Sequence, residues 1–189
     1  MILLEGPDGS GKTTLARNLA SNLRIEIAPR VVSKEAKALT DLVQWVNQNL
    51  REGPQAKIFD RHRLMSEFIY GNALRTRPEP GFTDFPNVLN WQTKLWQEID
   101  PLVVFCLPPL DIVMGNVVED EDNQVVWEKI PVIYSAYLQL ASMSYLYQPD
   151  RVLFYDYTMS HNKLPEFFVS EAQLITAIWD YLCEKGLRP

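Results

Sequence analysis

The sequence is poor in the residue types that mark several common classes of protein. Its 189 residues include only two cysteines and two histidines. Cys106 and Cys183 are too far apart in the sequence to form a metal knuckle or a disulfide framework, and we expect both to be reduced packing residues. Neither His62 nor His161 has a cysteine or histidine at ligand spacing, which argues against a zinc site.

Long apolar runs and an excess of positive charge are also missing. No apolar stretch reaches the roughly 18 residues that span a bilayer, and strand-like residues begin at Ile2, which leaves no room for a signal peptide. The net charge is −6 and the sequence pI is about 5.0, so no global basic field favours nucleic acid or an anionic membrane. These features predict a cytoplasmic protein without a membrane partner.

The length and the apolar content of 47% are those of one ordinary globular domain. Two loop-like stretches interrupt the chain, a proline-rich one at Thr76–Pro86 and an acidic one at Glu119–Asn123. Neither is long enough to be a linker between domains. We therefore expect residues 1–189 to form a single domain, with a lid-like segment at about 110–129.

Short β-rich runs alternate with longer helical patterns along the chain. The expected strands are Ile2–Glu5, Leu23–Ile27, Lys57–Phe59, Leu102–Leu107 and Val152–Tyr155. The expected helices are Lys12–Leu23, Lys34–Arg51, Leu64–Leu74, Pro86–Glu98, Ile130–Tyr147 and Glu171–Lys185, with Pro131 near a helix end. The alternation predicts an α/β fold with a five-stranded parallel sheet flanked by helices on both faces.

A glycine-rich loop joins the first expected strand to the first expected helix. Residues Gly6–Thr13 read GPDGSGKT and match G-x-x-x-x-G-K-[ST] at every fixed position. In such a loop, backbone amides cradle phosphates, the lysine reaches the β and γ oxygens, and the final hydroxyl binds Mg²⁺. The expected nucleotide-binding residues are Asp8, Gly9, Ser10, Gly11, Lys12, Thr13 and Thr14. The loop therefore predicts ATP with Mg²⁺ as ligands, in a three-layer P-loop NTPase fold.

A second charged motif follows the expected strand Lys57–Phe59. It reads Asp60-Arg61-His62-Arg63 and lies at the carboxyl end of the strand, where ligands of open α/β sheets bind. Phosphoryl transfer needs an anion clamp and a held metal ion, which guanidinium and carboxylate groups can supply. We expect Lys12, Asp60 and Arg61 to be catalytic, and Thr13 and Asp60 to hold the metal.

Four stretches resemble the thymidylate kinase group of P-loop nucleotide kinases, in that family's order: EGPDGSGKTT, FDRHRLMSEFIYG, DPLVVFCLPP and IYSAYLQLA. The resemblance covers most of the first 157 residues and is only general after Pro109. It implies that ATP phosphorylates a nucleotide acceptor, most simply a (deoxy)nucleoside monophosphate. The residues that would bind the acceptor are Arg61, Arg63, Phe68, Tyr70, Trp91 and Gln92. For Trp96, a position in the pocket and a position in the core both stay open.

The lid departs from this family's pattern, because such kinases usually close one or more arginines over the transferring phosphate. Asp111–Lys129 contains no arginine, and Gly115 and Asn116 stand near the expected arginine. The clamp must then be weak or come from other cations: Arg17, Arg61, Arg63, Arg75, Arg77 or Lys129.

Two further functions stay open at this point. One is a bacteriophage kinase that phosphorylates hydroxymethyluracil within DNA, with Arg61, Arg63, Arg75, Arg77 and Lys94 along the DNA backbone. The other is a nucleotide-binding module without catalytic activity. A GTPase is disfavoured because Asn162-Lys163 is followed by Leu164-Pro165 instead of completing N-K-x-D. The oligomeric state, including a homodimer, is not determined by the sequence.

Overall fold

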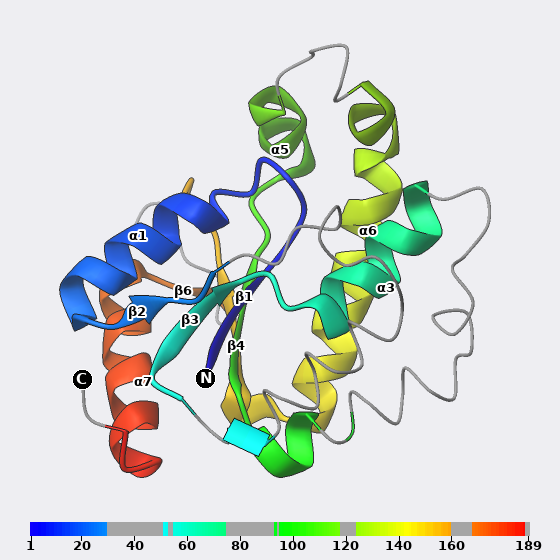
Figure 1. Ribbon diagram of the computed structural model, residues 1–189. Helices are drawn as coiled ribbons and strands as arrows, with labels where there is room; N and C mark the ends of the chain where they lie inside the picture. Colours follow the sequence, from blue (N-terminus) through cyan, green and yellow to red (C-terminus); the bar gives the residue numbers. More distant parts are fainter. Residues whose placement is uncertain are drawn as a thin grey trace.

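A six-stranded parallel sheet runs through the centre of the protein (Figure 1). The computed structural model describes residues 1–29, 51–52, 55–74, 93, 95–117, 124–159 and 168–187. The strands are β1 (Ile2–Glu5), β2 (Glu26–Ile27), β3 (Lys57–Asp60), β4 (Leu102–Cys106), β5 (Val152–Tyr155) and β6 (Phe168–Val169). Their order is β2-β3-β1-β4-β5-β6, and every pair is parallel.

The sheet differs from the five-stranded prediction at its two edges. β6 has only two residues and extends the sheet beyond β5, so its sequence carries too short a pattern to be detected. β2 is shorter than expected because the helix before it continues to Leu23 and Arg24 then takes a left-handed conformation with φ 54°. The central strands β1 and β4 match the prediction closely, and they are buried along their whole length.

Helices cover both faces of the sheet, which confirms the expected α/β class (Figure 1). They are α1 (Lys12–Leu23), α3 (Arg63–Leu74), α5 (Leu110–Asn116), α6 (Gln124–Tyr147) and α7 (Glu171–Glu184), with a π-helical turn at Leu95–Ile99 and a 3₁₀ turn at Pro149–Arg151. Most of the expected helices Lys34–Arg51 and Pro86–Glu98 lies outside the described residues.

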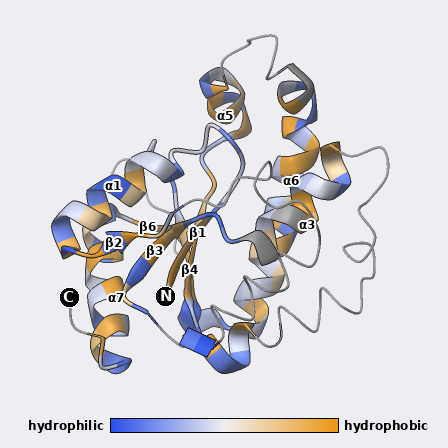
Figure 2. Cartoon of the chain, in the orientation of Figure 1, coloured by the Kyte–Doolittle hydropathy of each residue, from blue (hydrophilic) through white to orange (hydrophobic). Residues whose placement is uncertain are grey.

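Successive side chains of the central strands enter opposite cores, as the pleat of a strand requires. Leu3 and Val103 pack with residues of α3 and α6 in one core. Leu4 and Val104 pack with residues of α1 and α7 in the other. Figure 2 shows the result as largely apolar central strands between helices that carry both polar and apolar residues. The fold therefore has three layers.

The region after β4 was predicted least well. α5 was not expected, and α6 begins at Gln124, six residues before the predicted start. Pro131 therefore lies inside α6, and the prediction that it marks a helix end is wrong. α5 packs on α6 through a small apolar cluster that contains Val113, Val117 and Ile130. This contact fixes α5 above the carboxyl end of the sheet (Figure 1).

Two further sequence expectations concern the membrane and the cysteines. Within the ranges that the structure describes, no helix combines the length and apolarity needed to cross a bilayer. Both cysteines are free thiols; Cys106 is buried in β4, whereas Cys183 is exposed on α7. The expectation of a packing role is therefore right for Cys106 and wrong for Cys183.

Candidate active site

The glycine-rich loop, Gly6–Gly11, joins the end of β1 to the start of α1. Gly6 has φ 147°, and a Cβ there would collide with the carbonyl oxygen of Cys106. Gly11 has φ 82° and precedes α1 without a side-chain capping bond. The first-turn amides of α1 therefore have no side-chain acceptor from the capping residue and are placed to bind an anion.

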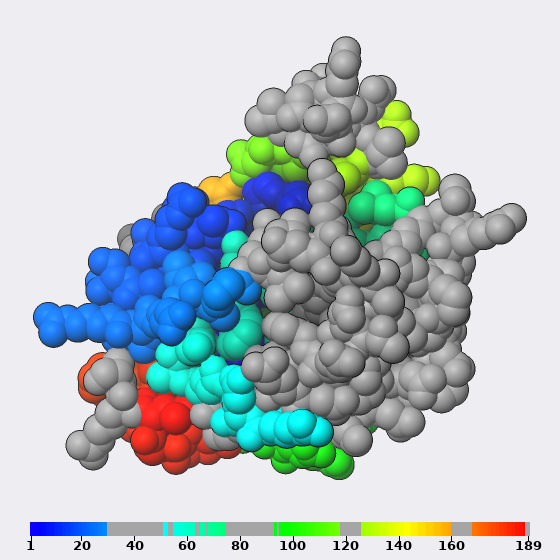
Figure 3. Space-filling view, in the orientation of Figure 1, coloured from blue at the N-terminus to red at the C-terminus, as the bar shows by residue number. Residues whose placement is uncertain are grey.

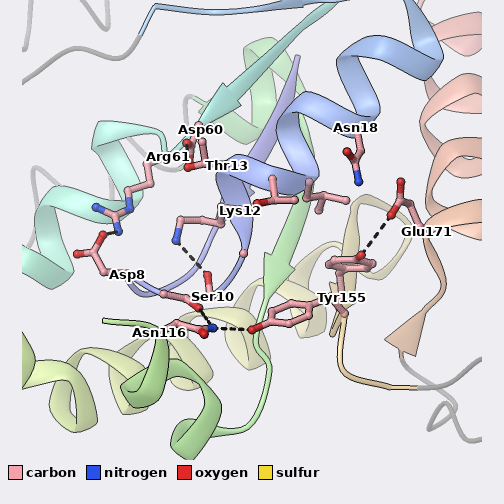
Figure 4. A pocket seen from close by; sticks show the side chains of 15 residues that line it. Asp8, Ser10, Lys12, Thr13, Asn18, Asp60, Arg61, Asn116, Tyr155 and Glu171 are labelled. Atoms are coloured by element: carbon pink, nitrogen blue, oxygen red, sulfur yellow. Dashed lines mark hydrogen bonds and ion pairs between the residues drawn. The ribbon is translucent and has the colours of Figure 1, made fainter. Parts of the chain in front are cut away.

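A cavity of about 720 Å³ lies beside this loop, at the carboxyl end of the sheet. The space-filling view shows the loop, in dark blue, reaching the surface between α1 and α5 (Figure 3). Residues from four parts of the chain line the cavity: Asp8–Leu15 and Asn18; Asp60 and Arg61; Asn116; and Tyr155, Tyr157 and Glu171. The structure thus brings the glycine-rich loop and the Asp-Arg motif to one site (Figure 4).

Lys12 is buried in this loop, with 5% of its surface exposed. Its Nζ donates to the carbonyl oxygen of Pro7 and, at 3.0 Å, to Ser10 Oγ. Burial, and secondly the charge of Arg61, lower the pKa of Lys12 to about 7. Both hydrogen-bond partners are uncharged, so the ammonium group lacks the directly bonded carboxylate that usually accompanies a buried lysine. An anion in the cavity would supply this missing charge.

Thr13 and Asp60, the two residues that we expected to hold a metal ion, lie next to each other in the lining of the cavity. Thr13 Oγ1 donates to Asp60 Oδ2 at 2.7 Å. A hydroxyl and a carboxylate are hard oxygen donors of the kind that Mg²⁺ prefers. In the described part of the chain, there is no group of three or more His, Cys, Asp or Glu side chains that could hold a metal ion. The pair therefore fits Mg²⁺ that takes its remaining ligands from water and substrate phosphates.

Arg61 is the second buried cation of the site, with 12% of its side chain exposed. Its guanidinium donates to Asp8 Oδ1 and, at 2.9 Å, to the hydroxyl of Tyr70, and its Cζ lies 4.5 Å from the centre of the Tyr70 ring. Burial acts to lower the pKa of Arg61, but Tyr70 and Asp8 outweigh it and raise this pKa. Arg61 is thus fully charged and held against the loop that carries Lys12.

Of the residues expected to bind an acceptor, the structure describes the side chains of Arg61, Phe68, Tyr70 and Trp96. The Tyr70 hydroxyl also accepts a bond of 2.8 Å from the Asp8 amide, so its hydroxyl and ring serve Arg61 and the loop. Phe68 and Trp96 are partly buried and pack against the core beneath α3 and α6. Trp91 and Gln92 lie outside the described residues, as do Arg75, Arg77, Lys94 and the side chain of Arg63.

Asn116 is one of the two residues near which the resemblance to nucleotide kinases led us to expect an arginine. Asn116, the last residue of α5, donates to the carbonyl oxygen of Gly9 at 2.9 Å and to the hydroxyl of Tyr157 at 2.6 Å (Figure 4). A neutral amide therefore joins α5 to the glycine-rich loop. Two of the cations proposed to replace the arginine, Arg17 and Lys129, have exposed side chains outside the lining of the cavity. The acidic residues at 119–122 lie outside the described residues.

Sequence reasoning missed the far end of the cavity. Asn18, Tyr155, Tyr157 and Glu171 come from α1, the end of β5, the turn after it and the start of α7, and no local motif joins them. Glu171 accepts a long bond of 3.5 Å from the Tyr155 hydroxyl. These residues become neighbours only through the order of the strands, which a single sequence does not reveal.

A buried carboxylate beneath the site was also missed. Glu5, the last residue of β1, has no exposed surface. Its Oε1 accepts from the His62 amide at 2.5 Å, and its Oε2 accepts from the Tyr137 hydroxyl at 3.2 Å. Burial raises the pKa of Glu5 to about 7. The available signal was a charged residue that ends an otherwise apolar strand beside the glycine-rich loop.

The sequence matches no protein-family model and has no significant match among curated proteins. Solved structures do share its fold. YorR from Bacillus subtilis, in complex with phosphorylated GDP, has a TM-score of 0.64 and 18% identity over 98% of this chain and 96% of its own. Deoxyadenosine kinase from M. mycoides with bound dATP has 0.58 and 15%, over 96% and 98%. Thymidylate kinase from Candida albicans has 0.55 and 15%, over 100% and 92%. The chain therefore has the α/β fold of P-loop nucleotide kinases.

Proposed function

We propose that the protein is a kinase that uses ATP and Mg²⁺ to phosphorylate a nucleotide, most simply a (deoxy)nucleoside monophosphate. One observation carries this proposal: Lys12 is buried with only uncharged hydrogen-bond partners, beside the uncapped first-turn amides of α1, in a cavity that Arg61 also lines. The carboxylates of the lining lie elsewhere in it, since Asp8 pairs with Arg61 and Asp60 bonds to Thr13. The end of the cavity at Lys12 therefore favours a phosphate group.

Lys12 and the amides at the start of α1 would hold the β- and γ-phosphates of the donor. The bond between the γ-phosphorus and its bridging oxygen breaks, an acceptor oxygen bonds to that phosphorus, and ADP leaves. Because charge then spreads over the equatorial oxygens, a cation fixed in a water-poor site stabilises the transition state. Lys12 is placed for this role, since its ammonium group already lies inside the loop.

Thr13 and Asp60 would hold Mg²⁺, which neutralises phosphate charge when it is bound. Arg61 would grip the acceptor phosphate from the side of β3, with Asp60 next to it in the chain. Tyr70 keeps the guanidinium in place from below through its hydroxyl and ring. The lid contributes the amide of Asn116, so in this proposal Lys12 and Arg61 provide the positive charge that a lid arginine provides elsewhere.

The comparisons support a nucleotide as the acceptor. The same fold is found in a deoxyadenosine kinase, in a thymidylate kinase and in a protein that was crystallised with phosphorylated GDP. The residues that would choose among bases, Trp91 and Gln92, lie outside the described residues.

The test is to offer γ-labelled ATP with Mg²⁺ and a panel of acceptors: deoxynucleosides, their monophosphates, and DNA that contains thymine or hydroxymethyluracil. We expect label on a free monophosphate, and no label with the Lys12→Ala variant. Label on DNA would replace the acceptor in this proposal by a base in a polymer. Label on no acceptor would overturn the proposal and favour a nucleotide-binding module.

A further inference from the structure

We propose that Glu5 is a positioning residue for Arg61, because its carboxylate fixes the left-handed turn that aims the guanidinium group at the glycine-rich loop. The inference rests on the proposed function for the role of Arg61 toward an acceptor. The geometry of the turn can be tested without it.

Glu5 is an unusual residue for its position. It is the one charged residue of β1, which is the central strand of the sheet, and it has no exposed surface. A buried carboxylate is costly unless hydrogen bonds compensate for its lost hydration. Glu5 has two such bonds, one to a main-chain amide and one to a hydroxyl.

The amide bond joins Glu5 to the turn that carries Arg61. Arg61 itself has φ 70°, a conformation that non-glycine residues keep only where the surroundings hold it. Two bonds to β1 flank it: the Arg61 amide donates to the Leu4 carbonyl at 3.0 Å, and the His62 amide donates to Glu5 Oε1 at 2.5 Å. The first bond continues the pairing of β1 with β3, whereas the second depends on the side chain of Glu5.

A second route reaches the guanidinium group through aromatic residues. Glu5 Oε2 accepts from the hydroxyl of Tyr137, which α6 brings into the core. The ring of Tyr137 packs against the edge of Tyr70, with 6.3 Å between ring centres and 68° between planes. Tyr70 in turn accepts from Arg61 at 2.9 Å. Glu5 therefore supports both the backbone and the side-chain end of Arg61.

The role of Glu5 can be divided into shape and charge. The charged and titratable groups around it are Lys12 of α1, Arg61 and His62 of the turn, Cys106 of β4 and Tyr137 of α6. Glu5→Gln keeps a carbonyl oxygen for the His62 amide and removes the charge. Glu5→Met fills a similar volume and removes the acceptor. If positioning is the role, the glutamine variant must rescue what the methionine variant loses.

The first measurement is the backbone amide proton of His62 in a ¹⁵N-resolved NMR spectrum. A short bond to a carboxylate shifts this proton downfield. We expect a clear upfield shift in Glu5→Met and an intermediate position in Glu5→Gln. An unchanged His62 amide in Glu5→Met would overturn the proposal. Should Glu5→Met fail to fold, Glu5→Asp withdraws the carboxylate by one methylene and must shift the amide in the same direction.

The second measurement separates the acceptor from the donor, with dTMP and ATP as probes. We expect Glu5→Met to raise the KM for dTMP about tenfold and to leave the Kd for ATP within about twofold, with Glu5→Gln within about threefold for both. Glu184→Gln, a change from acid to amide on α7 far from the turn, is the matched control and should leave both values unchanged. An equal loss for dTMP and ATP in Glu5→Met would overturn the positioning role. If the wild type phosphorylates no acceptor, the proposed function fails, and the His62 amide still decides the placement of the turn by Glu5.

Discussion

The two ends of the parallel sheet both carry clusters of charged side chains, and the clusters differ in how completely their charges are paired. At the amino ends of the strands, Asp100 accepts from Arg151 Nε at 3.1 Å and from Lys185 Nζ at 2.6 Å. Arg151 also donates to both carboxylate oxygens of Glu184. Two cations and two carboxylates meet there, and all four side chains remain partly exposed.

At the carboxyl ends the balance is different. Lys12 and Arg61 are more deeply buried than any cation of the first cluster, and their direct partners include a single carboxylate, that of Asp8. A fold optimised for stability alone would not keep this arrangement, because burial penalises charge that is incompletely paired. The first cluster joins structural elements, and the arrangement of the second supports our proposal that it binds an anionic ligand. We call them the amino-end cluster and the carboxyl-end cluster.

The largest expected effect comes from removing the ammonium group of the carboxyl-end cluster. Lys12→Ala should lower kcat by about 10³-fold or more, because the moving phosphoryl group loses its fixed cation. Initial rates with saturating ATP and acceptor measure the loss, and circular dichroism should show an unchanged fold. Normal turnover by Lys12→Ala would contradict the catalytic role that we propose for the carboxyl-end cluster.

Arg61→Ala should have the next largest effect and a different signature. We expect kcat/KM for the acceptor to fall about 10²-fold, while the Kd for ATP changes little, since the donor phosphates bind on the Lys12 side. Arg61→Lys is the control: it keeps the charge but loses the planar fork, and should recover only part of the activity. If Arg61→Ala weakened ATP binding more than acceptor binding, the donor and acceptor sides of the cavity in our proposal would have to be exchanged.

Glu5, which lies beneath the carboxyl-end cluster, should make a pH-dependent contribution to the stability of the protein. Burial raises the pKa of Glu5 from 4.5 to about 7, so between these values the unfolded chain loses a proton that the native protein keeps. The contribution of Glu5 to stability should therefore fall as pH rises from about 4.5 to 7, by at most about 1.4 kcal/mol per pH unit, and level off above pH 7. The lowered pKa values of His62, the amino terminus and Lys12 give contributions of the opposite sign, so urea unfolding is compared between the wild type and Glu5→Gln at several pH values. The stability difference between the two proteins should change with this slope, and a difference that does not depend on pH would contradict the prediction.

The sequence predicted the carboxyl-end cluster better than the elements around it. The glycine-rich loop and the Asp-Arg motif are local patterns with a fixed spacing, so Lys12 and Arg61 could be found without a structure. The contacts of Asn116 and Tyr157 join residues 41 positions apart, and the bond from Glu5 to His62 spans 57 positions. Such contacts follow from strand order and helix packing. Local periodicity does not encode them, and it also cannot reveal a strand as short as β6.

The amino-end cluster should give a change in stability without a change in activity. Asp100→Asn removes the charge that Arg151 and Lys185 share and should cost about 1–2 kcal/mol, less than a fully buried pair because these groups are partly exposed. Asp100 has φ 46°, and asparagine tolerates this conformation, so the backbone should not change. The urea midpoint should fall with kcat unaltered. A fall in kcat would show that the two ends of the sheet are coupled.

The smallest effect is expected at the last residue of α5. Asn116 is exposed and makes two hydrogen bonds, to Gly9 and to Tyr157, each worth about 0.5–1.5 kcal/mol at most. Asn116→Ala should loosen the glycine-rich loop and raise the Kd for ATP about two- to fivefold, as measured by calorimetry. Tyr157→Phe keeps the aromatic ring and leaves the bond from Asn116 to Gly9 intact, so the increase in the Kd for ATP should be smaller. Tighter ATP binding by Asn116→Ala would contradict this prediction. It would mean that the bond from Asn116 to Gly9 holds the loop in a conformation that has to change before the triphosphate binds.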